Sequence, residues 1–138
     1  MKKRESVSAI MTKDVISVSE KDSLEHVASI FKTKGIRHLP VKSGKKIVGI
    51  ISRTDINRLT FGALFDNQEG VDAAILEMLN IPQVMSENPR TVTSDTTIRE
   101  VAEIFSEAEY HSLPVVDNEE LKGIVTTTDV IKYMLEQY

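Results

Sequence analysis

The chain has 138 residues, of which 41% are apolar and 28% charged, with a net charge of −4 and no cysteine. This composition is that of a soluble globular domain, and the missing cysteine excludes a disulfide framework, a thiolate nucleophile and a Cys-based metal site. The sequence shows neither a signal peptide nor a run of roughly 20 apolar residues that could span a membrane, so we expect a cytoplasmic protein.

The first predicted elements are a strand, a helix, two strands and a second helix. Asp22 or Ser23 can cap the first helix, in which apolar residues recur at helical spacing. Gly35 suits a left-handed helix stop, and the second helix begins near Thr54. The strands are expected at 15–18, 39–41 and 47–51.

The same order of elements returns in the second half of the chain. Residues 60–72 predict a loop or broken helix, and residues 73–80 predict a helix. Beyond them, strands are expected near 90–93, 113–116 and 121–125, with helices capped by Thr96 or Thr97 and starting again at Thr128. A shift of 74 positions makes 13 of 46 residues identical without a gap, which marks an internal repeat.

We therefore predict a mixed α/β protein of two β-α-β-β-α repeats packed with pseudo-two-fold symmetry. Three short strands with helices do not close a core alone, so each repeat needs the other. The predicted boundaries are 1–60 for the first repeat, 61–80 for a linker with a connecting helix, and 81–138 for the second repeat.

The charges are distributed unevenly between the two halves. Residues 1–60 contain 13 Lys or Arg and 6 Asp or Glu, whereas residues 61–138 contain 4 and 15. Halves of opposite sign can pair across two copies, so we expect a homodimer, with an antiparallel arrangement favoured. The negative net charge argues against a nucleic-acid surface, although the first half alone is basic.

A short motif occurs once in each repeat, as "ISRTDI" at 51–56 and "VTTTDV" at 125–130. A hydroxyl residue three positions before an aspartate, between aliphatic residues, predicts a capping box with a hydrophobic staple. Such a cap is worth about 1 kcal/mol. Capping alone does not explain why both acids are aspartate, since the longer Glu or Gln usually reaches back to the cap.

These features resemble the cystathionine-β-synthase (CBS) domain family, and specifically the tandem pair called a Bateman module. The resemblance runs from Val7 to the C-terminus and rests on the pairs "IMTKDVISV" and "VMSENPRTV", "GIRHLPV" and "YHSLPV", and "VGIISRTDI" and "KGIVTTTDV". It implies a regulatory module, often dimeric, that binds an adenosine-containing ligand in clefts between the repeats. Such ligands are AMP, ADP, ATP, S-adenosylmethionine or a dinucleotide.

The resemblance places Asp55 with Ser52 at one cleft and Asp129 with Thr126 at the other. An ionised aspartate can accept hydrogen bonds from both hydroxyls of a ribose, and the N–H groups of the first helical turn favour a phosphate. The remaining ligand-binding candidates are Ile16, Ile36, Arg37 and Ile50 in the first repeat and Arg90, Tyr110, His111 and Ile124 in the second.

Several candidates have a second reading. Arg37 and His111 occupy equivalent positions and can contact phosphate, but Arg37 can also be a solvated charge and His111 a partly buried, hydrogen-bonded imidazole. The apolar candidates are expected to form the apolar walls of an adenine site. For each aliphatic residue taken singly, the alternative is a place in the hydrophobic core. Arg90 stands where the first repeat has Ile16, so it stacks on the base, reaches phosphate or blocks its cleft. We expect the two sites to differ in affinity.

Three functions follow from these candidates. The first is a non-enzymatic sensor that acts in trans on an unknown partner protein, without catalytic residues or an obligatory cofactor. The alternative is a ligand-free homodimer scaffold, with Arg37 or Arg90 as internal counter-charges. An enzyme acting on bound nucleotide has less support, because no second acid or nucleophile accompanies the aspartates. The three scattered histidines also lack the spacing of metal ligands.

Overall fold

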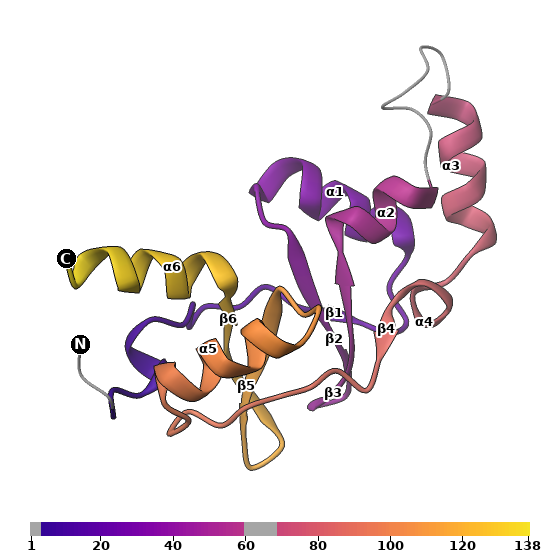
Figure 1. Cartoon of the computed structure of the whole chain (residues 1–138). Helices are drawn as coiled ribbons and strands as arrows, with labels where there is room; N and C mark the ends of the chain where they lie inside the picture. Colours follow the sequence, from indigo (N-terminus) through magenta and orange to yellow (C-terminus); the bar gives the residue numbers. More distant parts are fainter. Residues whose placement is uncertain (1–3, 60–68) are drawn as a thin grey trace. The chain divides into compact units, whose positions relative to one another are not determined.

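The computed structural model describes residues 4–59 and 69–138 and contains two compact units (Figure 1). One unit is Ile16–Asn88, and the other combines the residues up to Val15 with Pro89–Tyr138. Each unit has its own hydrophobic core and contains both helices and strands, which confirms the predicted α/β class. These units are groupings in space, whereas 1–60, 61–80 and 81–138 are stretches of sequence whose boundaries stay a prediction.

The unit Ile16–Asn88 follows the predicted order of elements and continues beyond it. Its sheet has the order β1-β2-β3-β4, in which β1 is parallel to β2 and the other neighbours are antiparallel. Its elements are β1 (Val18–Ser19), α1 (Leu24–Lys34), β2 (His38–Ser43), β3 (Lys46–Ser52), α2 (Arg53–Leu59), α3 (Glu69–Met78), α4 (Ile81–Val84) and β4 (Ser86–Glu87).

Three predicted bounds in this unit need correction. The strand expected at 15–18 pairs only over Val18–Ser19, and α2 begins at Arg53 rather than at Thr54. The helix expected at 73–80 is α3, which begins at Glu69. The loop or broken helix predicted for 60–72 falls largely on residues 60–68, outside the described residues.

Local sequence explains where α1 begins and ends. The Ser23 hydroxyl accepts a hydrogen bond from the His26 N–H at 3.1 Å, as expected for an N-cap. Gly35 follows the helix with φ 66°, the left-handed conformation that glycine adopts without steric cost. The apolar residues at helical spacing are buried, and they pack on β2 and β3 in one core.

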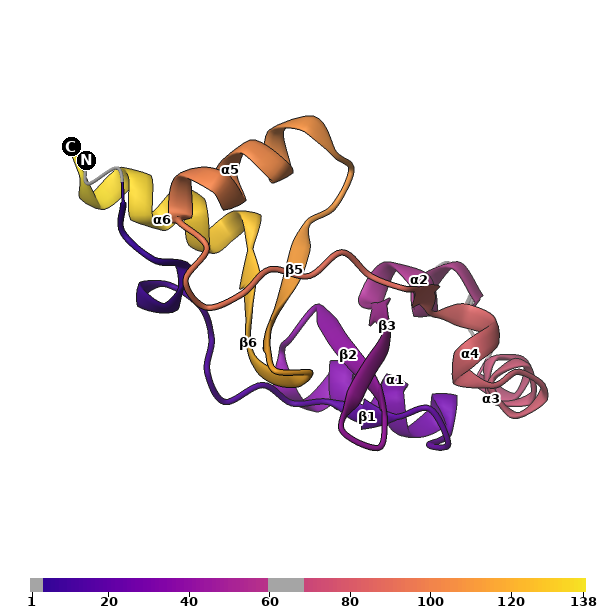
Figure 2. The same cartoon turned by 90° about the horizontal axis from the view of Figure 1, so that it is seen from below.

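The second unit repeats this plan with a smaller sheet. Its named strands form the hairpin β5–β6, and the strand expected at 90–93 is reduced to a parallel bridge between Val92 and Val115. In Figure 2, α6 continues directly from the end of β6. Its elements are η1 (Val7–Ala9), α5 (Ile98–Glu107), β5 (Ser112–Asp117), β6 (Glu120–Thr126) and α6 (Thr127–Glu136).

The segment that leads into each repeat adds to the sheet of the other repeat. Thr12 pairs with Ile124 of β6, whereas its counterpart Ser86 pairs with Ile50 of β3. The same exchange brings Met11 against Gly123 and Met85 against Gly49. A Cβ on Gly123 would lie 2.7 Å from the Met11 sulfur and 2.8 Å from the Thr12 carbonyl oxygen, and because the carbonyl belongs to the paired backbone, a larger residue would force the two segments apart.

Candidate functional site

Both repeated motifs form the predicted capping box. In the first, the Ser52 hydroxyl accepts from the Asp55 N–H at 3.1 Å, and Asp55 Oδ2 accepts from the Ser52 N–H at 2.8 Å. In the second, Thr126 and Asp129 make the same two bonds at 3.2 and 2.9 Å. The shorter aspartate therefore does reach back to the cap in both copies. Within the described residues, Oδ1 of each aspartate accepts no hydrogen bond.

The backbone of the preceding loop meets each cap. The N–H of Arg53, the first residue of α2, donates to the Arg37 carbonyl at 2.8 Å, and the Thr127 N–H of α6 donates to the His111 carbonyl at 3.1 Å. These bonds satisfy one of the free N–H groups at each helix start. They also place residues 36–38 and 110–112 beside the capping aspartate of their own unit.

Strand register places Ile50 near the capped start of α2 and, in the other unit, Ile124 near the capped start of α6. Ile50 pairs with Pro40 and Ile124 with Pro114, two residues before the capping Ser52 and Thr126. Successive strand residues point to opposite faces of a sheet. Because Ile51 belongs to the core beside the helices, Ile50 faces the other side of its hairpin, where it is half-buried.

Ile16 approaches the end of the β2–β3 hairpin that carries the cap of α2, and Arg90 approaches the corresponding end of the β5–β6 hairpin in the other unit. Ile16 lies two residues before Val18, which pairs in parallel with Val41 of β2. Arg90 lies two residues before Val92, which pairs in parallel with Val115 of β5. The two residues therefore lie toward the starts of β2 and β5, respectively. Both side chains are exposed. At this position the unit Ile16–Asn88 therefore has an apolar side chain, whereas the other unit has a cationic one.

The basic candidates have no counter-charge of their own. Arg37, Arg90 and His111 are exposed, and none forms an ion pair or side-chain hydrogen bond in the part of the chain that the structure describes. The ion pairs found there are Arg99–Glu103 and Lys122–Glu120. The His111 imidazole is exposed, so the prediction that it is partly buried is wrong. Within the described residues, neither Arg37 nor Arg90 neutralises an acidic side chain. Each unit therefore presents a carboxylate and at least one unpaired cation or potential cation near the helix start.

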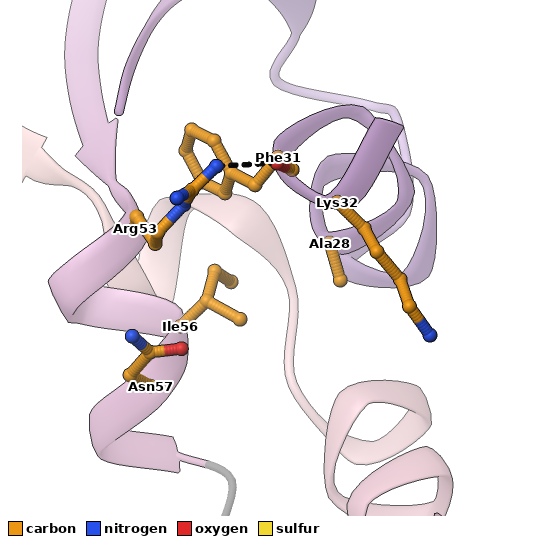
Figure 3. Close-up of a pocket in the computed structure, with 6 residues that line it drawn as sticks. All are labelled: Ala28, Phe31, Lys32, Arg53, Ile56 and Asn57. Atoms are coloured by element: carbon orange, nitrogen blue, oxygen red, sulfur yellow. Dashed lines mark hydrogen bonds between the residues drawn. The ribbon is translucent and has the colours of Figure 1, made fainter. Parts of the chain in front are cut away.

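One pocket was not foreseen from the sequence. It has a volume of about 330 Å³ and lies between α1 and α2, where none of the predicted ligand residues lines it (Figure 3). Its lining includes Arg53, whose guanidinium donates to the Phe31 carbonyl at 2.6 Å. The sequence gives no periodic signal for a hollow of this kind, because it depends on how two helices pack.

Two classes of site are not found within 4–59 and 69–138. There, no group of three or more His, Cys, Asp or Glu side chains could hold a metal ion. No helix within these ranges is long and apolar enough to cross a membrane.

The pattern of the CBS domain matches residues 7–61 and 81–136, which are the two repeats. The chain belongs to the CBS domain family. Two consecutive matches make it a tandem CBS pair, as the resemblance of the motifs predicted.

Relatives of this CBS pair are longer proteins. The uncharacterized protein MJ1225 of Methanocaldococcus jannaschii is 32% identical over 131 residues, which are 94% of this chain and 47% of MJ1225. The inosine-5′-monophosphate dehydrogenase of Korarchaeum cryptofilum is 33% identical over 123 residues, 88% of this chain and 23% of that enzyme. The chain thus spans half or less of these relatives, and most of the dehydrogenase lies outside the likeness.

Solved structures share the fold. The crystal structure of MJ1225 matches with a TM-score of 0.80 and 31% identity, over 97% of this chain and 49% of that one. The CBS domain pair of protein MJ0100, solved with 5′-methylthioadenosine and S-adenosyl-L-methionine, matches with a TM-score of 0.78 and 27% identity, over 96% and 98%.

Proposed function

We propose that this CBS pair is a regulatory module that binds an adenosine-containing ligand beside the capped start of α2, of α6 or of both. The observation that carries the proposal is the duplicated aspartate. Asp55 and Asp129 each commit Oδ2 to a helix cap and leave Oδ1 open to a further donor. The adjacent hydroxyls of a ribose are donors of the right kind for such a carboxylate.

The MJ0100 pair supports adenosine as the shared part of the ligand. Its two bound compounds are 5′-methylthioadenosine and S-adenosyl-L-methionine, which have an adenine and a ribose in common and carry no phosphate. The half-buried Ile36 and Ile50 offer an apolar wall for a base in one unit. Arg37 and Arg90, which form no ion pair within the described residues, favour a ligand that also carries negative charge, such as AMP, ADP, ATP or a dinucleotide.

Substitution of the two aspartates by asparagine tests this role. Asparagine keeps an acceptor oxygen for the cap but removes the carboxylate charge, so Asp55→Asn and Asp129→Asn should preserve folding and weaken binding. A charge-assisted hydrogen bond is worth roughly 1.5 to 3 kcal/mol, so we expect at least about tenfold weaker binding in calorimetry with AMP, ATP and S-adenosylmethionine.

Asp22→Asn is the matched control, because Asp22 accepts from a backbone N–H at 2.8 Å in an exposed turn outside both caps. Unchanged affinity of the double variant for every adenosine compound that binds the original protein would contradict the proposal. Absence of binding by the original protein would favour the alternative, a ligand-free interaction module. Among the described residues, Arg37 and Arg90 have no acidic partner. This argues against the version of that alternative in which the two arginines act as internal counter-charges.

Signalling to a partner protein in trans is part of the same proposal. A ligand can shift a conformational equilibrium only by its differential affinity for the two arrangements. Capture of a partner whose affinity changes with added ligand would support this role. A partner bound equally well with and without ligand would contradict it.

We also propose that the pair forms a homodimer. Its antiparallel form is predicted from opposite charges of residues 1–60 and 61–138, but the compact units divide the charges differently. The unit Ile16–Asn88 has nine basic and nine acidic residues, and the other unit has eight and twelve. Net unit charge therefore gives weaker support to the orientation than the halves of the sequence do.

A further inference from the structure

The pocket between α1 and α2 lies within the unit Ile16–Asn88, and none of the candidate nucleotide residues lines it. Its volume of about 330 Å³ is at the lower end of the range for small-molecule pockets, roughly 300 to 1,000 Å³. A compound with one ring or a short chain suits a pocket of this size. The described residues that line it are Ala28, Phe31, Lys32, Arg53, Ile56 and Asn57.

The lining divides into an apolar part and a polar part. Ala28, Phe31 and Ile56 are apolar, and Ala28 and Ile56 point toward each other from the two helices (Figure 3). Arg53 lies at one end of the pocket, and Lys32 extends outward at another (Figure 3). Among the described lining residues there is no Asp or Glu, so the polar part offers positive charge without an acid to neutralise it.

The polar part is not a requirement of the repeat. The apolar positions keep their character in the second unit, where they are Ala102, Phe105 and Val130. The polar positions become uncharged there, and they are Ser106, Thr127 and Ile131. The same two helices of the repeat therefore form without the two cations, and the fold alone does not account for them.

Arg53 is held in place for an acceptor. Its Nη2 donates to the Phe31 carbonyl at 2.6 Å, which fixes the guanidinium across α1 and α2. Within the described residues, its remaining side-chain N–H groups donate to no acceptor. The equivalent Thr127 makes no such bond to the Phe105 carbonyl, so the repeat does not need this contact to end its first helix. A guanidinium fixed in this way loses little side-chain freedom when it binds a carboxylate.

Lys32 adds a second, more adaptable cation. The side chain is exposed and forms no ion pair within the part of the chain that the structure describes. Its four-carbon stem lets the ammonium move toward an anion in the pocket, whereas the Arg53 guanidinium stays fixed. The pocket therefore combines an apolar floor with positive charge, which complements a molecule that has an apolar body and an anionic end.

We propose that the α1–α2 pocket binds a small carboxylate with an apolar body of one ring or a short chain. The carboxylate accepts hydrogen bonds from Arg53 and is attracted by Lys32, and the apolar body packs on Ala28, Phe31 and Ile56. This site is separate from the proposed adenosine sites and does not depend on them.

A titration of ¹⁵N-labelled protein with hexanoate and benzoate, followed by NMR, tests the site. Hexanamide and benzamide serve as uncharged counterparts of the same shape. We expect the carboxylates to shift the backbone amides of Ala28, Lys32 and Asn57, which belong to α1 and α2. The uncharged amides should bind about tenfold more weakly or less, because they lose a charge-assisted hydrogen bond worth roughly 1.5 to 3 kcal/mol.

Two variants introduce residues that the second repeat already has at the same positions. Arg53→Thr should weaken carboxylate binding about tenfold or more, and Lys32→Ser about two- to fivefold, since Lys32 is exposed. Arg58→Thr on α2 and Lys45→Ser in the β2–β3 turn are the matched controls, because neither residue lines the pocket. Both controls should leave the affinity unchanged, and circular dichroism melts would establish that all four variants fold.

Several outcomes would overturn this site. One is the absence of shifts with both carboxylates at millimolar concentrations, and another is equal binding of the carboxylates and their amides. Shifts confined to the amides around Ile36 and Ile50 would place the anion at the proposed nucleotide site instead. If Arg53→Thr does not fold, Lys32→Ser and the uncharged compounds still decide. Calorimetry with AMP reports on the adenosine sites separately, so either proposal can fail while the other stands.

Discussion

At the scale of single residues, each of the two aspartates caps a helix with one carboxylate oxygen and leaves the other for the proposed ribose contact. The cap uses one carboxylate oxygen, so capping and ribose recognition do not compete for the same atom. Each aspartate carboxylate also lies at the N-terminus of its helix, which is the positive end of the helix dipole, where a negative charge is favoured. A hydroxyl residue and an aspartate at this spacing therefore predict the cap from local sequence, while the ribose stays a proposal.

Asp117 makes a second local contact that links stability to pH. Hydrogen bonding from Ser94, first from its side chain and then from its backbone N–H, which lies 3.0 Å from Asp117 Oδ1, lowers the pKa of the Asp117 carboxyl below its usual value of 3.8. A lowered pKa stabilises the folded protein above pH 3.8, and the stabilisation is lost as the pH falls toward the folded-state value.

We expect Asp117→Asn to reduce the loss of stability on acidification through this range. The measurement is the urea midpoint of the original protein and the variant at several pH values on both sides of 3.8. Asp95→Asn, next to Ser94 in the segment before α5, serves as a control for general charge removal. Parallel pH profiles for the original protein and Asp117→Asn would contradict the assignment.

At the scale of elements, the two hairpins close with two-residue turns that differ in backbone conformation. Gly44 has φ 63° between β2 and β3, whereas Asn118 and Glu119 have φ 51° and 67° between β5 and β6. Two consecutive residues with positive φ are typical of a type I′ turn. Asparagine tolerates this conformation, but a glutamate in it carries a steric cost.

Glu119→Gly should therefore stabilise the β5–β6 hairpin by about 0.5 to 1 kcal/mol, since removal of the Cβ outweighs the added freedom of the unfolded chain. Asn118→Gly should bring a smaller gain, because asparagine already suits its position. Thermal melts of both variants would measure the difference. A lower melting temperature for Glu119→Gly would show that the turn carries no strain.

At the scale of the whole molecule, the exchange of lead-in segments ties distant parts of the sequence together. Val7 is fully buried in the core of the second unit, and its counterpart Ile81 is fully buried in the core of the first. The Val7 N–H donates to the Thr96 carbonyl at 2.8 Å, and the Ile98 N–H donates to the Glu5 carbonyl at 2.8 Å. Residues at the beginning of the chain thus stabilise its last elements.

Val7→Ala and Ile81→Ala form a matched pair that tests this exchange. The first should cost on the order of 2 kcal/mol and the second about 2 to 5 kcal/mol, from lost burial and the cavities left behind. In hydrogen–deuterium exchange, Val7→Ala should weaken protection mainly in α5 and β6, and Ile81→Ala mainly in α1 and β3. Weaker protection in the first repeat after Val7→Ala would contradict the exchange.

Local patterns in the sequence were sufficient to predict the repeat, a cap at Asp22 or Ser23, the cap at Thr126, the stop at Gly35 and both hairpins. Each of these depends on residues a few positions apart, whose spacing and turn chemistry are visible in the sequence. The resemblance to the CBS family, and not local spacing, selected the twelve candidate ligand residues, which stand at equivalent positions of the two repeats. Strand register and the helix-start hydrogen bonds place Arg37 and Ile50 near one cap and His111 and Ile124 near the other, and their role in binding stays a prediction.

Only the tertiary structure decided which strands the segments around Thr12 and Ser86 pair with. Each segment forms only one or two residue pairs, which is too short for its sequence to show an alternation that would identify the partner strand. The tertiary structure also decided that residues up to Val15 share a unit with Pro89–Tyr138, which changes the charge of each unit from that of the corresponding half of the sequence. The pocket beside Arg53 likewise follows from packing between helices. Such features depend on contacts between residues far apart in the chain, which local spacing does not encode.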